Sequence, residues 1–390
     1  MRRKARAGPA LILAAGALIQ LLTGFPSAWG AFKNPVMQSF QLDSASAGYA
    51  ANSLVAAYGL GCVLGGLLQD RWGPKTAGIC GSLLLCGGLA AVGFVPGERP
   101  MLFYLAFSLP VGAGCAFLYP AVMSCVQKWY GQRKGMATGV VGLGVGLSGL
   151  VLTLAVKLIG GRWGMRICFW TFAAVLGPLC LGCSFLLKAP NQKAAASRQQ
   201  GMKPGQMLKT RQFYLAFLSM AFAAPALLLF SPGIIELAQK HGLSSAWAEG
   251  LVIVGTLGAA AGRLLAPLAG DRWNRVKINC LRFLFLAGLS VGLRFAGGFF
   301  FGMVYLLLCF CYAGQLANMP ALCTQLFGLA HTGVNYGFLA LGASLGSLAF
   351  PVASKQLGLA DGRHWLAAVS ALAGLLCLRR LELPRQENKK

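Results

Sequence analysis

The sequence predicts an all-α integral membrane protein, with twelve transmembrane helices arranged in two pseudo-symmetric bundles of six. Three observations lead to this prediction. The 390 residues are 57% hydrophobic and only 11% charged, whereas soluble domains carry about 25% charged residues. Apolar stretches long enough to cross a bilayer recur along the whole chain. One charged phrase, Asp-Arg-Trp, begins at Asp70 and again at Asp271.

Twelve apolar windows are each long enough to cross a bilayer as a helix. They lie at roughly 10–32, 47–68, 76–95, 101–122, 137–159 and 166–188, and then at 211–234, 246–268, 278–297, 300–323, 333–356 and 364–378. The basic start and apolar middle of the first window also fit a cleaved signal peptide. Because eleven further spans follow it rather than a secreted domain, we interpret it as the first helix.

The net charge of +25 is distributed as short clusters between the apolar windows. It forms no basic stripe with interleaved aromatic residues, so nucleic acid is not an expected partner. Placing both termini in the cytoplasm puts 24 of the 34 Lys and Arg residues in cytoplasmic segments. This positive-inside bias predicts a multi-pass protein of the cell inner membrane, surrounded by the lipid bilayer, with both termini cytoplasmic. We expect it to be a monomer.

The longest polar stretch, from Lys188 to Thr210, divides the windows into six and six. We therefore expect an N-terminal bundle over 1–188, a cytoplasmic linker over 189–210, and a C-terminal bundle over 211–390 with a short basic tail. Each Asp-Arg-Trp phrase follows the second window of its half. The two halves are accordingly predicted to be structural repeats, as in transporters that alternate access around a central site.

The first phrase belongs to a longer pattern that we interpret as a gate, formed by Gly66, Asp70, Arg71, Gly73 and Lys75. The glycines allow a tight cytoplasmic turn, and the Asp70 carboxylate can accept from Arg71 or from a helix N-terminus across the interface. The pattern resembles the signature of the major facilitator superfamily, in which it is associated with stabilising the outward-facing state. Simple anchoring by positive charge would explain the basic residues but neither the aspartate nor the glycine spacing.

The second phrase, Asp271 and Arg272, is a degenerate copy, because Pro267 and Asn274 replace the two glycines. Its gating role is therefore less firmly predicted than that of the first. The predicted gate also includes two basic residues in the cytoplasmic turn between the fourth and fifth windows, Arg133 and Lys134.

Several other motifs are better explained by helix packing than by chemistry. Gly144-x-Gly146-x-x-Gly149 matches a dinucleotide fingerprint in letters, but it lies inside an apolar window without a preceding strand. The thirteen cysteines lie mostly within apolar windows, where redox or zinc chemistry is not expected. No phosphate-binding loop and no Ser, His and Asp set is present. The sequence therefore predicts neither an enzyme nor a cofactor or metal site.

The acidic residues all fall in loops, tails or helix ends. They are Asp43, Asp70, Glu98, Glu236, Glu249, Asp271, Asp361, Glu382 and Glu387. Proton-driven drug exporters and sugar symporters usually carry a buried carboxylate as the proton or cation site. This distribution therefore argues against such a mechanism.

Arg263 is the cation that matters most within the spans. It precedes Asp271 by eight residues, which places it about 12 Å into the membrane, too deep to reach water easily. Its preceding neighbours Ala259 to Gly262 leave space around the guanidinium. A permanently charged guanidinium in such a setting is a good bidentate partner for a carboxylate. The alternatives are snorkelling and a structural bond to helix carbonyls.

Four stretches carry a closer family resemblance. "AWGAFKNP", "GAGCAFLYPAVMSCVQKWYGQRKGMATGVVGLGVG", "KTRQFYLAFL" and "PALCTQLFGLAHTGVNYG" together resemble the oxalate:formate antiporter family, and more distantly the monocarboxylate transporters. In that family an arginine of the eighth helix binds the substrate carboxylate, and Arg263 is the matching residue. Members that carry dicarboxylates add a lysine midway along the eleventh helix. Here that region reads "LALGASLGSLAF", with Lys355 only beyond Pro351.

The resemblance implies transport of a small organic anion, by antiport or by proton-linked symport, and the departure at this lysine favours a monocarboxylate such as formate or lactate over oxalate. We expect further substrate contacts from aromatic and amide side chains on facing helices. These are Trp29, Asn52, Tyr119, Tyr312, Gln315 and Asn318, of which Gln315 and Asn318 form the favoured pair because an amide in an apolar setting needs a partner. A drug or metabolite exporter of the same fold, and a non-transporting membrane sensor, are the alternative functions.

Overall fold

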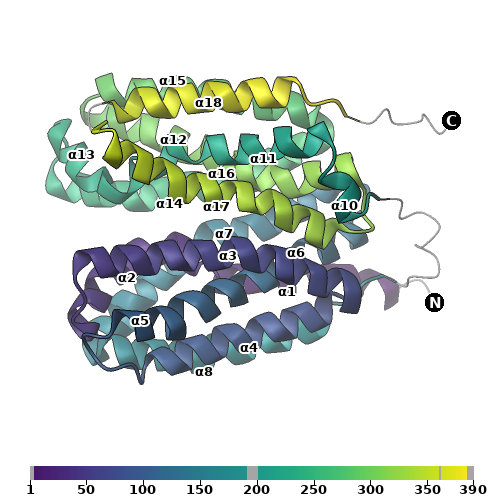
Figure 1. The fold of residues 1–390 in the computed structure, drawn as a ribbon, viewed down its shortest axis with the longest axis horizontal. Helices are drawn as coiled ribbons and strands as arrows, with labels where there is room; N and C mark the ends of the chain where they lie inside the picture. Colours follow the sequence, from purple (N-terminus) through teal and green to yellow (C-terminus); the bar gives the residue numbers. More distant parts are fainter. Residues whose placement is uncertain (1–3, 191–200, 360–361, 384–390) are drawn as a thin grey trace.

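The computed structural model describes residues 4–190, 201–359 and 362–383. Within these ranges the chain is helical, and the only β-type pairing is an isolated bridge between Gly201 and Gly328. Figure 1 shows two bundles side by side, with α1 to α8 in one and α11 to α18 in the other. The predicted fold class is therefore confirmed. The acidic residues Asp361 and Glu387 and linker residues 191–200 lie outside the described part.

The first bundle contains the helices of the N-terminal half. They are α1 (Lys4–Leu22), α2 (Phe25–Phe40), α3 (Ser44–Trp72), α4 (Pro74–Val92), α5 (Pro100–Phe103), α6 (Leu109–Trp129), α7 (Lys134–Ala155) and α8 (Gly161–Leu186), with π-helical turns at Tyr104–Ser108 and Val156–Gly160. Here α1 with α2 forms the first span, and α5 with α6 forms the fourth.

The second bundle repeats this plan after the short α10 (Pro204–Met207). Its helices are α11 (Arg211–Ala223), α12 (Pro225–Leu228), α13 (Ile234–Lys240), α14 (Ser245–Arg272), α15 (Arg275–Phe295), α16 (Gly298–Phe327), α17 (Thr332–Gln356) and α18 (Arg363–Arg379). Ten segments of the described chain are long and apolar enough to span a membrane, and one of them, Lys134–Leu186, contains both α7 and α8. Together with the 17-residue α18, the helices match the twelve predicted windows.

The first span is longer than predicted, because the helix continues from the expected end at residue 32 to Phe40. Polar residues in this stretch, such as Lys33 and Asn34, lower its hydropathy and conceal the helix from a composition window. An aromatic face holds it in place. Phe32 stacks on Phe169 with ring centroids 6.1 Å apart, and Phe40 contacts Phe103 at 5.1 Å. These rings are buried in the core of the N-terminal bundle.

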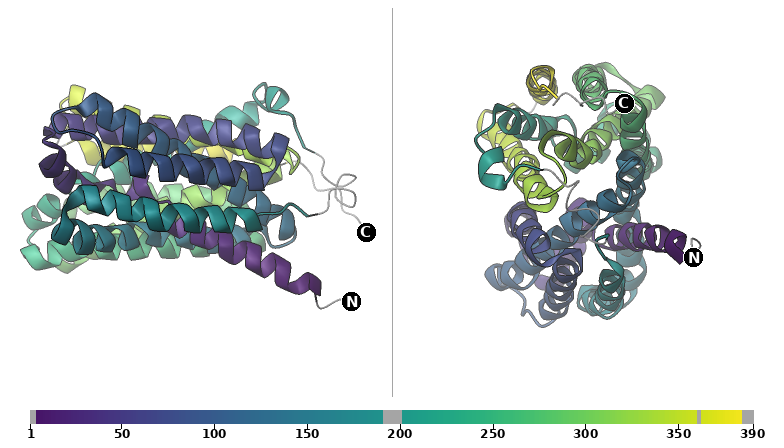
Figure 2. Two further views of the ribbon diagram at one scale, coloured as in Figure 1. Left: turned by 90° about the horizontal axis from the view of Figure 1, so that it is seen from below. Right: turned by 90° about the vertical axis from the view of Figure 1, so that its right-hand side faces the viewer.

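Both bundles present their helix ends to two common faces. The start of α1, the end of α18 and the short α10 lie at the same end of the molecule, on the right in Figure 1 and toward the viewer in the right-hand view of Figure 2. The ends of α3 and α14, which carry Asp70 and Asp271, lie at this end too. We call it the latch face. The described end of the predicted linker binds here, since Met202 N donates to the Phe327 carbonyl at 2.8 Å.

Candidate functional site

Asp70 joins the two bundles at the latch face. Its carboxylate accepts hydrogen bonds from the backbone N–H groups of Gly333 at 3.3 Å and Val334 at 2.9 Å, at the N-terminus of α17. A carboxylate is stabilised at this position because the first N–H groups of a helix have no partner within the helix and carry partial positive charge. Of the two acceptor roles predicted for Asp70, the structure shows the helix N-terminus.

Asp271 forms the corresponding latch in the opposite direction. Its two carboxylate oxygens accept from Gly135 N and Met136 N, both at 2.8 Å, at the N-terminus of α7. Its Oδ1 also pairs with the Arg275 guanidinium one turn along the chain. The degenerate spacing of the second phrase therefore does not prevent its interaction. Asn274 takes another role, since its side chain accepts from Val276 N and Lys277 N and caps α15.

The other residues of the predicted gate make different contacts from those of the two aspartates. Gly73 adopts φ +87°, which favours glycine and lets α3 turn into α4. Arg71 and Lys75 lie over aromatic rings, at 5.0 Å from Trp72 and 4.7 Å from Phe185 respectively, rather than on the aspartate.

Besides Arg275, two cations interact with the latch aspartates, and one of them, Lys134, belongs to the predicted gate. Lys128 interacts electrostatically with Asp70, and Lys134 interacts with Asp271. Arg133 and Arg272 are exposed. Sequence reasoning missed Lys128 and Arg275, although the spacing of Arg275, four residues after Asp271, fits a helical ion pair.

Tight backbone contacts run from each latch toward the middle of the protein. A Cβ built on Gly139 of α7 would lie 2.6 Å from the Leu264 carbonyl oxygen of α14, and one on Gly146 would lie 2.5 Å from Cα of Ala260. Between α3 and α17, a Cβ on Gly66 would lie 2.7 Å from Cα of Val334. Such distances leave no room for a side chain, so the bundles are closed along the latch half.

The contacts end near mid-height. Gly59 lies seven residues before Gly66 on the same face of α3. It still contacts α17, because a Cβ built on Gly59 would lie 2.7 Å from the Cβ of Ser344. Asn52, a further seven residues back on that face, is exposed. In the other pair, Gly149 of α7 has no atom within 4 Å of its Cβ position, and Ile253 of α14 is 52% exposed. The halves thus separate toward the face opposite the latches.

Arg263 lies where the tight contacts end. Its backbone meets α7 at Gly142, where a Cβ would lie 3.1 Å from the Arg263 carbonyl oxygen. The guanidinium interacts electrostatically with the phenol groups of Tyr58, Tyr119 and Tyr312, which come from α3, α6 and α16. Arg263 is partly buried, and its buried Nε has no hydrogen-bond partner in the described part of the chain. Helices of both bundles therefore bring tyrosine side chains within electrostatic range of this guanidinium.

A tyrosine pair lies between this site and the latches. The rings of Tyr119 and Tyr336 stack with centroids 5.6 Å apart, and the Tyr58 ring lies 6.4 Å from Tyr119. Tyr336 is only four residues into α17, about 6 Å from its start at the latch face. Tyr58 and Tyr336 were not among the predicted site residues. A tyrosine four residues after a helix start has no sequence signal that separates it from ordinary packing.

The two amides of the favoured pair differ in their environment. Gln315 is completely buried, and neither its Oε1 nor its Nε2 has a hydrogen-bond partner among the described residues. It lies one turn from Tyr312 on α16, and therefore on the same face. An amide left unpaired in the interior costs free energy, which makes a ligand a good partner for it.

Asn318, by contrast, already has partners. Its Oδ1 accepts from Arg275 at 3.1 Å and its Nδ2 donates to Asn279 Oδ1 at 2.8 Å. Asn279 also accepts from Arg282 at 3.1 Å. Asn318 thus belongs to a buried network that links α15, α16 and the Asp271 latch.

The remaining predicted contacts lie away from the guanidinium. Trp29 packs in the aromatic core of its bundle, with ring centroids 5.7 Å from Phe107 and 6.4 Å from Phe103. Its indole N–H is buried and has no hydrogen-bond partner within residues 4–190, 201–359 and 362–383. Asn52 is exposed on the stretch of α3 beyond the closed contacts.

This arrangement of helices is that of a known family. The family model of the Major Facilitator Superfamily matches residues 12–351. The chain belongs to the major facilitator superfamily. Superfamily members in solved structures share the fold. The E. coli fucose:proton symporter FucP superposes with a TM-score of 0.74 at 15% identity, covering 96% of this chain and 98% of that one. A mutant of XylE gives 0.77 at 14% identity, covering 96% of each.

Relatives within the superfamily include proteins with assigned substrates. The oxalate:formate antiporter of Oxalobacter formigenes is 24% identical over 82% of this chain and 78% of its own length. The 3-(3-hydroxy-phenyl)propionate transporter of Escherichia coli is 24% identical over 91% and 88%. An uncharacterized 38 kDa protein of Thermoproteus tenax is 30% identical over 82% of each chain. As a superfamily transporter, the protein is a membrane protein that acts on small molecules and is not an enzyme.

Proposed function

We propose that this superfamily member carries small organic anions, and that the Arg263 guanidinium binds their carboxylate. The observation that supports this most strongly is the buried Nε of Arg263, which has no hydrogen-bond partner among the described residues, on a guanidinium within electrostatic range of tyrosines from both bundles. A planar guanidinium presents two parallel donors to a carboxylate, and hydroxyl donors complete the shell. No acidic side chain of the described spans pairs with it, so the site keeps its positive charge for the substrate.

The substrate class follows from the charge at the site. The names of two relatives, the oxalate:formate antiporter and the 3-(3-hydroxy-phenyl)propionate transporter, refer to carboxylate substrates, which supports an organic anion as the substrate here. The middle of α17 carries no lysine, and Lys355 is exposed near the end of that helix. One guanidinium without a second cation suits one carboxylate better than two. We therefore favour monocarboxylates such as formate or lactate over oxalate.

Further contacts are assigned from the same geometry. We propose that Tyr119, Tyr312 and the unpaired Gln315 bind substrate oxygens, and we add Tyr58 to this set. Asn318 receives a structural role, because its amide is already bonded. Trp29 and Asn52 are proposed to line the route toward Arg263.

The latches define the state of the transport cycle. The positive-inside bias makes the latch face cytoplasmic, with both termini on that side. The described conformation is then closed to the cytoplasm, and release inward requires both aspartates to leave their helix N-termini. Because no carboxylate lies midway along a described span, we propose that the anion moves by exchange or brings its own proton. The protein is proposed to act as a monomer.

Uptake into proteoliposomes tests this function. Labelled formate, lactate and oxalate are supplied outside, with and without unlabelled acid inside, for the wild type and Arg263→Gln. We expect one monocarboxylate to accumulate with the wild type. Uptake by the Arg263→Gln protein should be at least about tenfold lower, because a charge-assisted pair contributes about 1.5–3 kcal/mol. Lys355→Gln is the matched control and should transport normally.

Two results would reject the proposal. If Arg263→Gln transports as well as the wild type, the cargo is not held by this guanidinium, and an exporter of uncharged or cationic compounds becomes the better explanation. If acids bind to the purified wild type without crossing the membrane, the protein is a sensor rather than a transporter. Stimulation of uptake by internal acid indicates exchange, whereas stimulation by an inward proton gradient indicates symport.

A further inference from the structure

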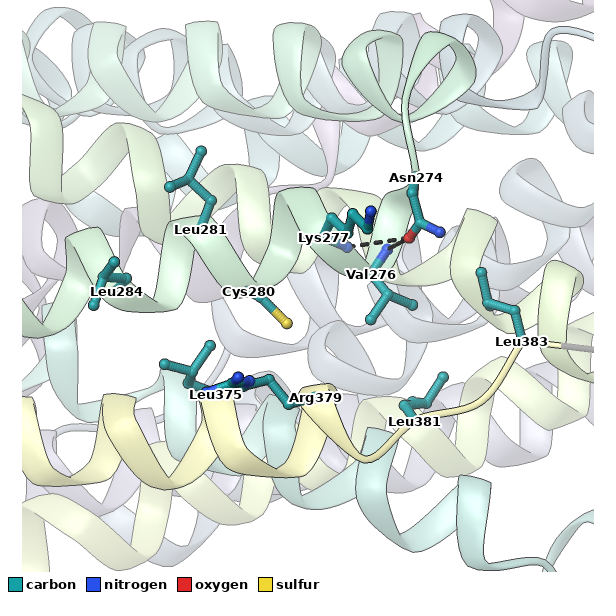
Figure 3. Close-up of a pocket in the computed structure, with 10 residues that line it drawn as sticks. All are labelled: Asn274, Val276, Lys277, Cys280, Leu281, Leu284, Leu375, Arg379, Leu381 and Leu383. Atoms are coloured by element: carbon teal, nitrogen blue, oxygen red, sulfur yellow. Dashed lines mark hydrogen bonds between the residues drawn. The ribbon is translucent and has the colours of Figure 1, made fainter.

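A groove separates α15 from α18 at the latch face. It encloses about 680 Å³, and its walls are formed by the first turns of α15 and the last turns of α18 (Figure 3). Ten residues line it: Asn274, Val276, Lys277, Cys280, Leu281, Leu284, Leu375, Arg379, Leu381 and Leu383. The groove lies on the C-terminal bundle, outside the site around Arg263 and outside the contacts between the bundles.

The groove combines an apolar floor with two cations. Lys277 and Arg379 stand on opposite walls in Figure 3, and both are exposed. Neither forms an ion pair with any carboxylate of the described residues, and none of the ten lining residues is acidic. The backbone N–H groups of Val276 and Lys277 are already bonded to the Asn274 cap, so the side chains of Lys277 and Arg379 are the charged donors of the groove.

The apolar part continues along the membrane-facing surface. Leu281 and Leu284 of α15 are 53% and 55% exposed, and on α18 the neighbouring Leu376 is 56% exposed. In a membrane-spanning chain this surface meets acyl chains, while the ends of α15 and α18 meet the headgroup layer. A ligand that fits must therefore carry a negative charge at the level of Lys277 and Arg379 and hydrocarbon at the level of the leucines.

We propose that this groove is a binding site for an anionic phospholipid of the leaflet on the latch side. The phosphate is held by Lys277 and Arg379, and one acyl chain lies along Leu281 and Leu284. Basic pockets between transmembrane helices on the cytoplasmic side favour anionic headgroups. Zwitterionic lipids gain less there, because their own cation opposes the same two side chains.

The test compares phosphatidylglycerol with phosphatidylcholine of identical acyl chains. The full-length protein is purified in detergent and incubated with an equal mixture of the two lipids, and the retained lipids are counted by native mass spectrometry. We expect the wild type to retain about tenfold more phosphatidylglycerol, from two interfacial cations. Lys277→Gln/Arg379→Gln should abolish the preference. Lys203→Gln/Lys209→Gln removes two exposed charges from the same face outside the groove and should keep it.

A second variant separates shape from charge. Cys280→Trp fills the groove without altering its charge, and it should reduce retention of phosphatidylglycerol, whereas Cys80→Trp on α4 should not. Equal retention by the wild type and Lys277→Gln/Arg379→Gln would overturn the proposal, as would equal retention of the two lipids. If soluble glycerol phosphate displaces phosphatidylglycerol, the groove binds a soluble anion and is not a lipid site. Thermal unfolding of each variant without lipid verifies that the variants are folded.

Discussion

Tyr119 of α6 stacks on Tyr336 of α17, with ring centroids 5.6 Å apart, and this contact joins the two bundles between Arg263 and the latch face. The Tyr119 hydroxyl also interacts electrostatically with the Arg263 guanidinium. Tyr119 therefore belongs both to the proposed anion site and to the contact that closes the latch half. Substrate binding at Arg263 and opening of the latch half therefore share a residue. The predictions below separate these two roles.

Tyr119→Phe keeps the stacked ring and removes the hydroxyl group. If that hydroxyl binds substrate, the KM for transport should rise about 2- to 10-fold, since one hydrogen bond contributes about 0.5–1.5 kcal/mol. Tyr336→Phe keeps the same stack and should leave KM closer to the wild-type value. Uptake measured over a range of acid concentrations distinguishes the two. Equal KM values for Tyr119→Phe and the wild type would remove this hydroxyl from the site.

Gln315→Met replaces an unpaired buried amide by an apolar side chain of similar size. The protein without substrate should become more stable, on the order of 1 kcal/mol, because a desolvated amide is removed. Substrate should then protect the variant less against thermal unfolding than it protects the wild type. If Gln315→Met lowers stability and leaves substrate protection unchanged, its amide has a structural role instead.

Asn318→Leu is expected to have the opposite effect on stability. Removing this amide leaves Arg275 and Asn279 without one partner each, and an unpaired buried group costs about 1–3 kcal/mol. The melting temperature should fall, and detergent-solubilised protein should aggregate earlier on heating. A melting temperature equal to that of the wild type would show that the network adds no net stability.

Asp70→Asn weakens one latch and leaves the other chemically unchanged. A carboxylate at a helix N-terminus contributes about 0.3–2 kcal/mol, so opening at the start of α17 should become about 2- to 30-fold more frequent. Hydrogen exchange of the Gly333 and Val334 amides measures this directly. The Gly135 and Met136 amides, which bind Asp271, report whether the second latch opens with the first. Unchanged exchange at Gly333 and Val334 would mean that the Asp70 charge does not stabilise closure.

Gly139→Ala tests the close contact between α7 and α14. The added methyl group would lie 2.6 Å from the Leu264 carbonyl oxygen, so closure of the latch half should be destabilised by about 1–3 kcal/mol and transport should slow about tenfold or more. Gly149→Ala, on the same helix beyond the closed contacts, meets no atom within 4 Å. It should transport normally and be slightly more stable, because alanine is the better helix former. Similar transport rates for both variants would contradict this account of closure.

The sequence by itself determined the class of the protein and the number of its spans. Bilayer thickness fixes the length of an apolar helix, so hydropathy alone located the helices. It failed at α2, where burial of Phe32 and Phe40 against other aromatic rings stabilises a helix that carries polar residues. The Asp-Arg-Trp phrases marked the latch aspartates, and depth in the membrane singled out Arg263, because an unpaired charge is costly there.

Only the tertiary structure decided what these residues contact. The partners of Asp70 and Asp271 are backbone N–H groups, which every sequence has and which become distinctive only when a helix begins beside the carboxylate. The same holds for Gln315 and Asn318, which are one turn apart on α16 and chemically alike. Asn279 and Arg275 of α15 bond to the Asn318 amide, whereas the Gln315 amide has no partner among the described residues. Which amide is paired depends on which helix packs against each face of α16. Packing between segments distant in sequence therefore separated structural residues from candidate binding residues.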